Sequence, residues 1–268
     1  MSRLSLEIAQ VRVDLVVPSA EPIGLARYRP FAGAAGTPEW TLELGPGTYD
    51  AAVPPGRSLV ERAGRWCISG IEDQAWLDPE ARTGVASVDR ACLVLDTLVR
   101  AAVARSVLED GGLLVHGAAI VVDGAAHLFP ARSGSGKSTL AARAAHPLSD
   151  ELSIIRAGPA GYQAHASPWW VSNGGSAPLA CIYELAWNGE GVTPLHRTAI
   201  RQLATNLVIP LDSPDSRGQA SRRPRWSPGR PRSRGSHSTS RATWTPSSAE
   251  ARRARPRQVP GAWDDAAW

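Results

Sequence analysis

Lysine is almost absent from this sequence. Lysine and arginine together number 29, and Lys137 is the single lysine among them. Both residue types keep a protein surface soluble, but the compact ammonium of lysine suits a site crowded with phosphate oxygens in a way that the broad guanidinium does not. The lone lysine therefore marks position 137 as a candidate binding residue.

Cysteines and long apolar runs are also scarce. The three cysteines, Cys67, Cys92 and Cys181, are odd in number, widely spaced and without a CxxC pair. This pattern argues against a disulfide framework and a zinc site, and it favours a reducing compartment. No apolar run reaches the roughly 18–20 residues of a membrane-spanning helix, and the N-terminus lacks the apolar segment of a secretory signal. We therefore expect a cytoplasmic protein with no membrane partner.

Positive charge is concentrated at the C-terminal end. Residues 218–268 hold eleven Arg and three acidic residues, a net charge of +8, whereas the whole chain carries +4, so residues 1–217 sum to −4. The same stretch contains no Leu, Ile, Phe or Met. Such a segment cannot bury enough apolar surface to offset its ordering entropy, which predicts a disordered tail. The folded part is not expected to bind nucleic acid specifically.

The abrupt change of composition also suggests that this tail is translated out of frame from a GC-rich coding stretch. Shifting the coding DNA by one base should then reveal a Leu/Ala-rich amphipathic pattern, and its absence from both shifted frames would reject the hypothesis. The alternative is a genuine basic tail that binds nucleic acid or a membrane surface without specificity.

Residues 1–86 predict a small β-rich module, because short strand-like segments alternate with Gly/Pro-rich turns. The expected strands are Leu4–Val17, Leu25–Phe31, Trp40–Leu44 and Arg65–Ile71. Ser87 is expected to cap a helix that runs to about Leu108 and packs without a functional role.

Residues 87–217 predict an α/β domain with a mixed sheet, in which a hairpin precedes a Gly-rich loop. Asp123-Gly124 is a strong type I′ turn signal between the strands Ala118–Val122 and Ala125–Phe129. A helix from about Lys137 to Ala145 and a strand at Leu148-Ser149 follow the loop. The later expected elements are strands at Tyr162–Ala166, Pro178–Trp187 and Val192–Leu195, a hairpin turn at Asn188-Gly189, and a short helix over Arg197–Val208.

The Gly-rich loop Ala131–Ser138, ARSGSGKS, matches the phosphate-binding P-loop pattern with Ala in place of the first Gly. Gly134 and Gly136 let backbone N–H groups converge on phosphate oxygens, and Lys137 reaches the β- and γ-phosphates. The Ser138 hydroxyl is placed to bind Mg²⁺. The pattern predicts ATP with Mg²⁺ as the ligand. The expected nucleotide-binding residues are Ala131, Arg132, Ser133, Gly134, Ser135, Gly136, Lys137, Ser138 and Thr139.

Three further residues are catalytic candidates. Asp150 lies thirteen residues after Lys137, and either it or Glu151 could accept a proton from an attacking hydroxyl while the other serves the metal. We expect Ser138 and Asp150 to bind Mg²⁺. His116 lies in the strand expected to pair with the strand that feeds the loop. The alternatives are a capping role for Asp150 and a core role for His116.

Taken together, these residues resemble the C-terminal catalytic domain of HPr kinase/phosphorylase, and more specifically its short bacterial relatives. The resemblance rests on His116-Gly117, the hairpin, the loop, Asp150-Glu151 and the Ser167-Pro-Trp-Trp segment, and it covers about residues 110–210. It implies the fold shared with ATP-dependent phosphoenolpyruvate carboxykinase and transfer of phosphate from ATP to a protein serine.

The resemblance also implies residue roles. Ser133–Ser138 would bind the phosphates, and His116 would pair with Asp150 to move the proton of the acceptor serine. Glu151 stands where that family has a second Asp, so the base stays open between Asp150 and Glu151. The N-terminal module does not match the regulatory enzymes of that family, so HPr itself is not taken as the acceptor, and the expected acceptor is a serine on a protein or on a small peptide.

The leading functional hypothesis is therefore an ATP-dependent serine kinase acting on a protein or a peptide. A small-molecule kinase or ATPase is one alternative, and a non-catalytic nucleotide-binding module that regulates a partner is another. Assembly into a homo-oligomer stays open.

Overall fold

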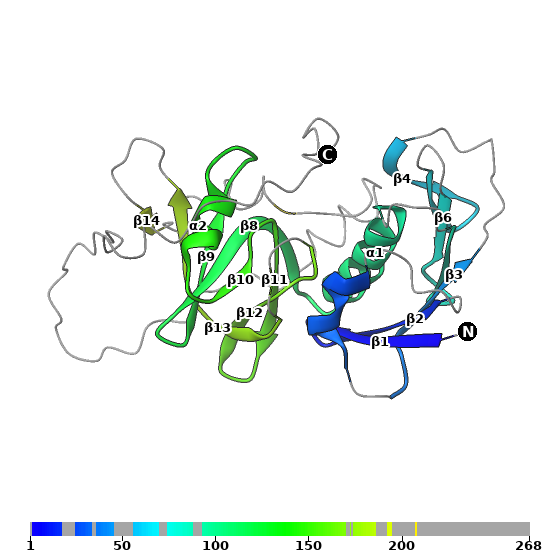
Figure 1. Cartoon of the computed structure of the whole chain (residues 1–268), viewed down its shortest axis with the longest axis horizontal. Coiled ribbons are helices and arrows are strands. Elements are labelled where there is room, and N and C mark those ends of the chain that lie inside the picture. The colour runs from blue at the N-terminus through cyan, green and yellow to red at the C-terminus, as the bar shows by residue number, and fades with distance from the viewer. Residues whose placement is uncertain are drawn as a thin grey trace, which may run out of the picture.

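The computed structural model describes residues 2–17, 25–33, 36–45, 56–69, 74–87, 93–169, 172, 174–185, 192–194 and 207. Within these residues, two β-rich units flank one long helix, α1 (Leu93–Glu109) (Figure 1). The predicted tail over 218–268 and the turn at Asn188-Gly189 lie outside the described residues. So does the predicted helix Arg197–Val208, apart from Leu207, which forms an isolated antiparallel bridge with Val115.

The first unit is a seven-stranded sheet with the order β1-β2-β3-β7-β6-β5-β4. β3 runs parallel to β2 and β7, and the other neighbouring pairs are antiparallel. In β3, Trp40, Leu42 and Leu44 are buried and the residues between them are more exposed, which is the period-2 pattern of a strand with one face on the core. The strands are β1 (Ser2–Ile8), β2 (Val11–Val17), β3 (Trp40–Gly45), β4 (Gly56–Arg62), β5 (Arg65–Ser69), β6 (Gln74–Asp78) and β7 (Thr83–Ser87).

The segment expected to be one strand over Leu4–Val17 is a hairpin instead. Ala9 and Gln10 both have positive φ, 50° and 68°, and join β1 to β2 in register. A two-residue turn with two positive φ angles matches the twist of the strands that it connects. Neither residue favours this conformation, so the turn is imposed by the pairing of the strands.

The segment Leu25–Phe31, also expected to be a strand, forms the 3-10 helix η1. Its buried residues Leu25, Tyr28 and Phe31 recur every third position, which is the period of a 3-10 helix and not of a strand. η1 therefore packs one apolar edge on the core.

Ser87 is the last residue of β7 and does not cap the following helix. Its Oγ accepts a hydrogen bond from the Gln74 N–H at 2.7 Å and donates to the Gln74 carbonyl at 3.0 Å. In the described part of the chain, the helix begins at Leu93.

α1 is buried on nearly all of its circumference. It contacts β2, β6 and β7 of the first sheet, and on another side it contacts β8 (Leu113–Val122) of the second unit. The view in Figure 1 shows it between the two units. A helix enclosed in this way can present apolar residues on every side, and eleven of the seventeen residues of α1 are apolar.

The second unit is a closed ring of five strands in the order β8-β11-β12-β13-β9, with β9 returning to β8. β9 and β13 are parallel, and the other four pairs are antiparallel. Two short strands, β10 and β14, extend the ring along β8 and β13. The strands beyond β8 are β9 (Ala125–Pro130), β10 (Pro147–Ser149), β11 (Leu152–Gly158), β12 (Gly161–His165), β13 (Ser176–Leu185) and β14 (Val192–Pro194).

The expected α/β kinase fold of the HPr kinase and phosphoenolpyruvate carboxykinase type is therefore wrong. The described residues contain fourteen strands but only α1, η1 and the seven-residue helix α2 (Lys137–Arg143). Short turns connect β8 to β9 and β11 to β12, and such turns produce antiparallel neighbours. Without crossover helices to cover an open sheet, the strands close on themselves.

One local prediction of this region is confirmed. Asp123 and Gly124 have φ values of 50° and 76° and form the two-residue turn between β8 and β9. Among the helices in the described ranges, none has the length and apolar character needed to cross a bilayer.

Candidate functional site

The strand β8 lies between the Gly-rich loop and the two acidic residues. The Ala131 N–H, at the start of the loop, donates to the His116 carbonyl at 3.4 Å, and the Gly117 N–H donates to the Glu151 carbonyl at 2.9 Å. The pair His116-Gly117 therefore joins the loop to the acidic segment through the backbone. This confirms the predicted pairing of the His116 strand with the strand that feeds the loop.

Gly117 has no room for a side chain. A Cβ atom at this position would lie 2.9 Å from the Phe129 carbonyl oxygen and 3.0 Å from Pro130 Cα. Both atoms are backbone atoms of β9, and so neither can rotate away. Glycine at 117 thus allows the strand that feeds the loop to approach β8 closely.

Asp150 and Glu151 form a bend that interrupts one continuous register. β10 pairs Ser149 with Ala119, and β11 pairs Leu152 with His116, so both segments follow β8 in the same alignment. Two buried hydroxyls fix the bend on both sides. Ser153 Oγ donates to the Gly117 carbonyl at 2.8 Å and lies 2.5 Å from Ser149 Oγ.

The loop carries its lysine folded back on itself. Lys137 is buried, with 4% of its surface exposed, and its Nζ donates to the carbonyls of Ala131 and Arg132, both at 2.9 Å. Gly134 and Gly136 have φ values of 76° and 87°, in the left-handed region that favours glycine. These two glycine conformations curve the loop around the Lys137 ammonium.

The loop residues fit a nucleotide with its metal. Ser135 Oγ is buried and has no hydrogen-bond partner among the described residues, which is unusual for a hydroxyl and leaves a donor for a ligand oxygen. Ser138 is exposed. In the described ranges no group of three His, Cys, Asp or Glu side chains could hold a metal. Mg²⁺ does not need such a group, because it is commonly held by one or two protein oxygens, by phosphates and by water.

His116 and Glu151 form a contact on the surface of this site. His116 Nε2 lies 3.1 Å from Glu151 Oε1, and the two side chains are 27% and 38% exposed. Within the part of the chain that is described, this nitrogen has no well-aligned hydrogen bond, so the contact rests on the short distance between the two side chains. The resemblance implied a His116 pair with Asp150, whereas the acid at ion-pair distance is Glu151.

The Glu151 carboxylate is in a positive field. Burial raises the pKa of Glu151, but the contact and charge of His116 lower it, as do the charges of Lys137 and Arg100, and the net pKa lies below the ordinary value. Glu151 is therefore ionised at neutral pH. The effect of Lys137 on Glu151 brings the loop and the bend into one electrostatic site.

Asp150 is placed differently from its neighbour. Only 6% of its surface is exposed, and the bend of β10 and β11 holds it beside β8. Its burial suits a ligand or a structural group better than a base that must reach a solvent-borne hydroxyl.

Sequence reasoning missed Arg100, which lies on the helix that was assigned a packing role only. Its charge acts on Glu151, and its Cζ lies 5.2 Å from the centroid of the Trp169 ring. The available signal was an acid and a base four residues apart, Asp96 and Arg100, in the first half of a largely apolar helix.

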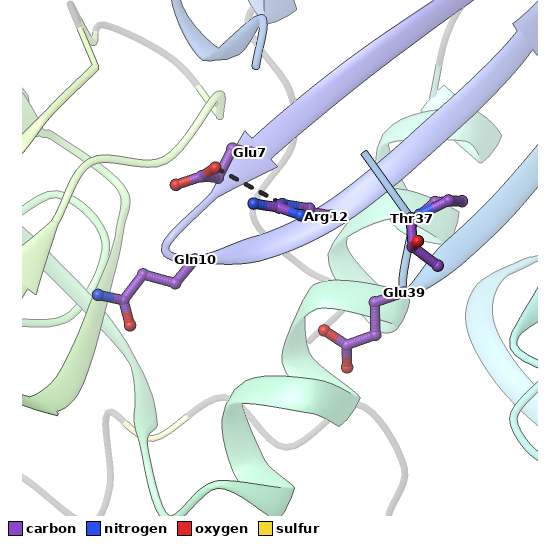
Figure 2. A pocket seen from close by; sticks show the side chains of 6 residues that line it. Glu7, Gln10, Arg12, Thr37 and Glu39 are labelled. Carbon is purple, nitrogen blue, oxygen red and sulfur yellow. Dashed lines mark ion pairs between the residues drawn. The ribbon is translucent and has the colours of Figure 1, made fainter. Parts of the chain in front are cut away.

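A hollow of the surface lies away from the loop. It has a volume of about 320 Å³ and is lined by β1, β2 and the segment before β3 (Figure 2). Glu7 and Arg12 form an exposed ion pair at 3.9 Å on its wall. No residue of the phosphate loop lines it. Its lining residues are Glu7, Gln10, Arg12, Thr37, Pro38 and Glu39.

One family of known proteins matches the chain. A family model described as SynChlorMet cassette protein ScmC matches residues 85–216. The matched segment is 132 of the 268 residues, just under half of the chain. It contains α1, the loop and the five-stranded ring. No curated protein matches the chain.

This match corrects the expected resemblance to HPr kinase/phosphorylase and its short relatives. The family model that matches is that of ScmC, not that of an HPr kinase family. The expected resemblance depended on a phosphate loop, a His-Gly pair and an acidic pair, which are short local patterns. Such patterns can occur in more than one family.

Proposed function

We propose that this chain binds ATP with Mg²⁺ at Ala131–Thr139 and transfers the γ-phosphoryl group to a hydroxyl, with a serine of a protein or peptide as acceptor. The observation that supports this most is Lys137. It is the single lysine of the chain, it is buried in a loop with two left-handed glycines, and its ammonium donates to two carbonyls of that loop. Phosphate oxygens would be stronger partners for this charge than neutral carbonyls.

The exposure and charge of each residue at this site suggest its role in phosphate transfer. Lys137 and the loop amides would hold the phosphates, and Ser138 with Asp150 would hold Mg²⁺, which neutralises phosphate charge when bound. Glu151, kept ionised by its surroundings and contacted by His116, would accept the acceptor's proton. The acceptor oxygen then bonds to the γ-phosphorus as the bond from that phosphorus to ADP breaks.

A macromolecular acceptor is favoured by the exposure of the loop. Arg132, Ser133, Ser138 and Thr139 are exposed, so a serine carried on another chain can approach this face. A cytoplasmic location belongs to the same proposal, because ATP is available there and neither Cys67 nor Cys181 is in a disulfide.

Calorimetry with ATP and Mg²⁺ tests the binding step. Lys137→Ala should weaken ATP binding by about 100-fold or more, because a charge-assisted contact with two phosphates is lost. Arg143→Ala is the matched control, because Arg143 is an exposed cation at the end of the same helix. Equal heats for all three proteins would reject the nucleotide site.

Radiolabelled γ-phosphate tests the transfer step. With a lysate as the source of acceptors, label should appear on a protein or peptide, and Glu151→Gln should reduce its rate by about 10²–10⁴-fold, the usual contribution of a general base. Label found only in inorganic phosphate would indicate an ATPase. ATP binding without turnover would indicate a regulatory module.

A further inference from the structure

Three aromatic side chains lie together where β9 and β13 run side by side in the five-stranded ring. The Tyr183 ring stacks on the Phe129 ring, with centroids 5.2 Å apart and planes that differ by 16°. The same tyrosine contacts the His127 ring, with centroids 5.6 Å apart and planes that differ by 38°. Tyr183 of β13 therefore lies across two residues of the neighbouring strand. We call His127, Phe129 and Tyr183 the aromatic shelf.

The aromatic shelf is on the outside of the ring. Along β9, Ala126 and Leu128 belong to the main hydrophobic core. Successive side chains of a strand point to opposite faces, so His127 and Phe129, which alternate with them, point away from that core. Phe129 is buried and yet is not a member of the core cluster. Its burial therefore comes from contacts on the outer face.

The aromatic shelf is also next to the phosphate loop. A strand advances by about 3.3 Å per residue, so the backbone at Phe129 is about 7 Å from Ala131, the first residue of the loop, and the backbone at His127 is about 13 Å from it. Ala118, which pairs with Phe129 in β8, and Ala141 of α2 are likewise buried outside the core cluster. Since α2 contacts β8, the helix that follows the loop lies on the same outer face as the aromatic shelf.

The chemistry of the aromatic shelf suits a flat heterocycle. Tyr183 and His127 are half-buried, so part of each side chain can be reached by a ligand. Aromatic side chains bind planar rings by offset stacking, and every nucleobase has a face that can stack in this way. A nucleotide that places its phosphates in the loop carries its base one ribose away from them, which is the scale of the distance from the loop to the aromatic shelf.

We propose that the aromatic shelf is the subsite for the adenine base of ATP, with Tyr183 as the ring on which the base stacks and Phe129 as its support. The inference rests on the proposed function, because it takes the phosphates to be bound at Lys137. It makes β13, which lies far from the loop in sequence, part of the nucleotide site through its parallel pairing with β9.

Two ligands separate recognition of the base from recognition of the phosphates. ATP carries both, whereas inorganic tripolyphosphate carries the phosphates alone. In calorimetry with Mg²⁺ on the full chain, Tyr183→Ala should weaken ATP binding by about tenfold or more, the usual effect of losing a base–aromatic stack, and should leave tripolyphosphate binding within about twofold of wild type. Tyr183→Phe keeps the ring and should bind both ligands as wild type does.

Tyr162→Ala is the matched control. Tyr162 is a half-buried tyrosine of the same ring, but it is on β12, which pairs with β11 and β13 and not with β9. This variant should bind both ligands as wild type does. If Tyr183→Ala does not fold, Tyr183→Leu takes its place, because leucine keeps apolar bulk at the position without an aromatic face.

Three results would overturn the proposal, and they differ from a failure of the proposed function. Equal weakening of ATP and tripolyphosphate binding by the Tyr183 variants would mean that the three rings only pack β9 against β13. An unchanged ATP affinity would place the base elsewhere, and an unchanged ATP affinity with slower transfer of label to protein would mean that the aromatic shelf contacts the acceptor. If wild type binds neither ligand, the proposed function itself fails, and the base subsite fails with it.

Discussion

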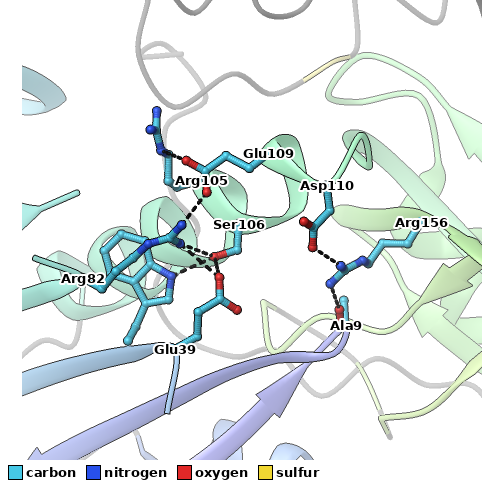
Figure 3. A network of polar contacts seen from close by, with 9 residues as sticks. Ala9, Glu39, Arg82, Arg105, Ser106, Glu109, Asp110 and Arg156 are labelled. Atoms are coloured by element: carbon cyan, nitrogen blue, oxygen red, sulfur yellow. Dashed lines mark hydrogen bonds and ion pairs between the residues drawn. The ribbon is translucent and has the colours of Figure 1, made fainter. Parts of the chain in front are cut away.

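Near its first turn, α1 hides a carboxylate among buried groups, whereas its last turn carries polar contacts that water can reach. Asp96 is 7% exposed and is bonded to Tyr28 and Arg27. At the other end, Glu109 contacts Arg82 at 2.5 Å and Arg105 at 2.6 Å (Figure 3). Polar contacts hold α1 at both ends, but the Asp96 contacts are buried in the protein whereas the Glu109 contacts are partly exposed to water.

The second network extends to both β-rich units. Figure 3 shows Arg82 and Glu39 of the first sheet meeting Ser106, and Arg156 of β11 meeting both Asp110 and the Ala9 carbonyl. Exposed ion pairs of this kind contribute about 0–1 kcal/mol each. Removing one partner of a buried pair costs about 3–5 kcal/mol, because the other is left uncompensated. The two ends should therefore respond very differently to mutation.

The largest expected effect comes from breaking the buried end. Asp96→Ala should lower the free energy of unfolding by about 3 kcal/mol, since it leaves the buried Tyr28 hydroxyl without its acceptor and Arg27 without its ion-pair partner. Urea denaturation monitored by tryptophan fluorescence measures it. Asp96→Asn should cost clearly less. A loss below about 1 kcal/mol for Asp96→Ala would remove the distinction between the two ends.

A fall in pH should affect His165 and buried Asp96 differently, because protonation of His165 lowers the free energy of unfolding and protonation of Asp96 raises it. Burial first, and the charge of Arg156 second, lower the pKa of His165 from its ordinary 6.5 to about 4. Between these values the unfolded chain takes up a proton that the folded chain refuses, so stability falls as the pH falls. The pKa of Asp96 is raised in the folded chain. The folded chain therefore takes up this proton at a higher pH than the unfolded chain does, and the uptake increases the free energy of unfolding as the pH falls.

The expected outcome is a difference between two denaturation series. Between pH 7 and pH 4.5, wild type should lose about 2 kcal/mol more than His165→Gln, which is less than the full pKa shift would give because pH 4.5 lies above the folded pKa of about 4. Equal losses in the two proteins would show that His165 is not held neutral.

The sequence predicted this fold in its local parts only. Asp123-Gly124 specified a hairpin because both residues tolerate positive φ, whereas Ala9 and Gln10 carry no such signal and adopt it because β1 and β2 pair. The closure of the second unit joins β9 to β13 across more than fifty residues, as in the pair Leu179 and Ala126. The alternation of residues along a strand does not determine which distant strand it will pair with.

The sequence predicted those features of the candidate site whose residues lie in one short stretch of the chain. The loop around Lys137 and the backbone link to His116 followed from adjacent residues. The contact of His116 with Glu151 instead depends on a bend set by the hydroxyls of Ser149 and Ser153, and nothing in the order Asp150-Glu151 selects one acid. Arg100 lies far away in sequence and is brought near by packing.

A smaller effect is expected from Ser106, which bonds both to a buried residue and to a partly exposed one. Its Oγ accepts from the buried Trp40 Nε1–H at 2.8 Å and from Arg82 Nη1 at 2.9 Å. Ser106→Ala should cost about 1–2 kcal/mol, because the indole N–H loses its acceptor while the arginine finds water. Combining it with Trp40→Phe should recover part of that cost in a double-mutant cycle. Strict additivity would contradict the pairing.

The smallest effect should come from the exposed end. Glu109→Gln removes the charge that faces Arg82 and Arg105, whose side chains are 33% and 27% exposed, and should lower the free energy of unfolding by about 0.5 kcal/mol. Because mobile ions screen exposed charges, this difference should vanish in about 1 M salt, whereas the loss in Asp96→Ala should persist. A salt-independent loss larger than about 2 kcal/mol for Glu109→Gln would mean that this end of α1 is enclosed too.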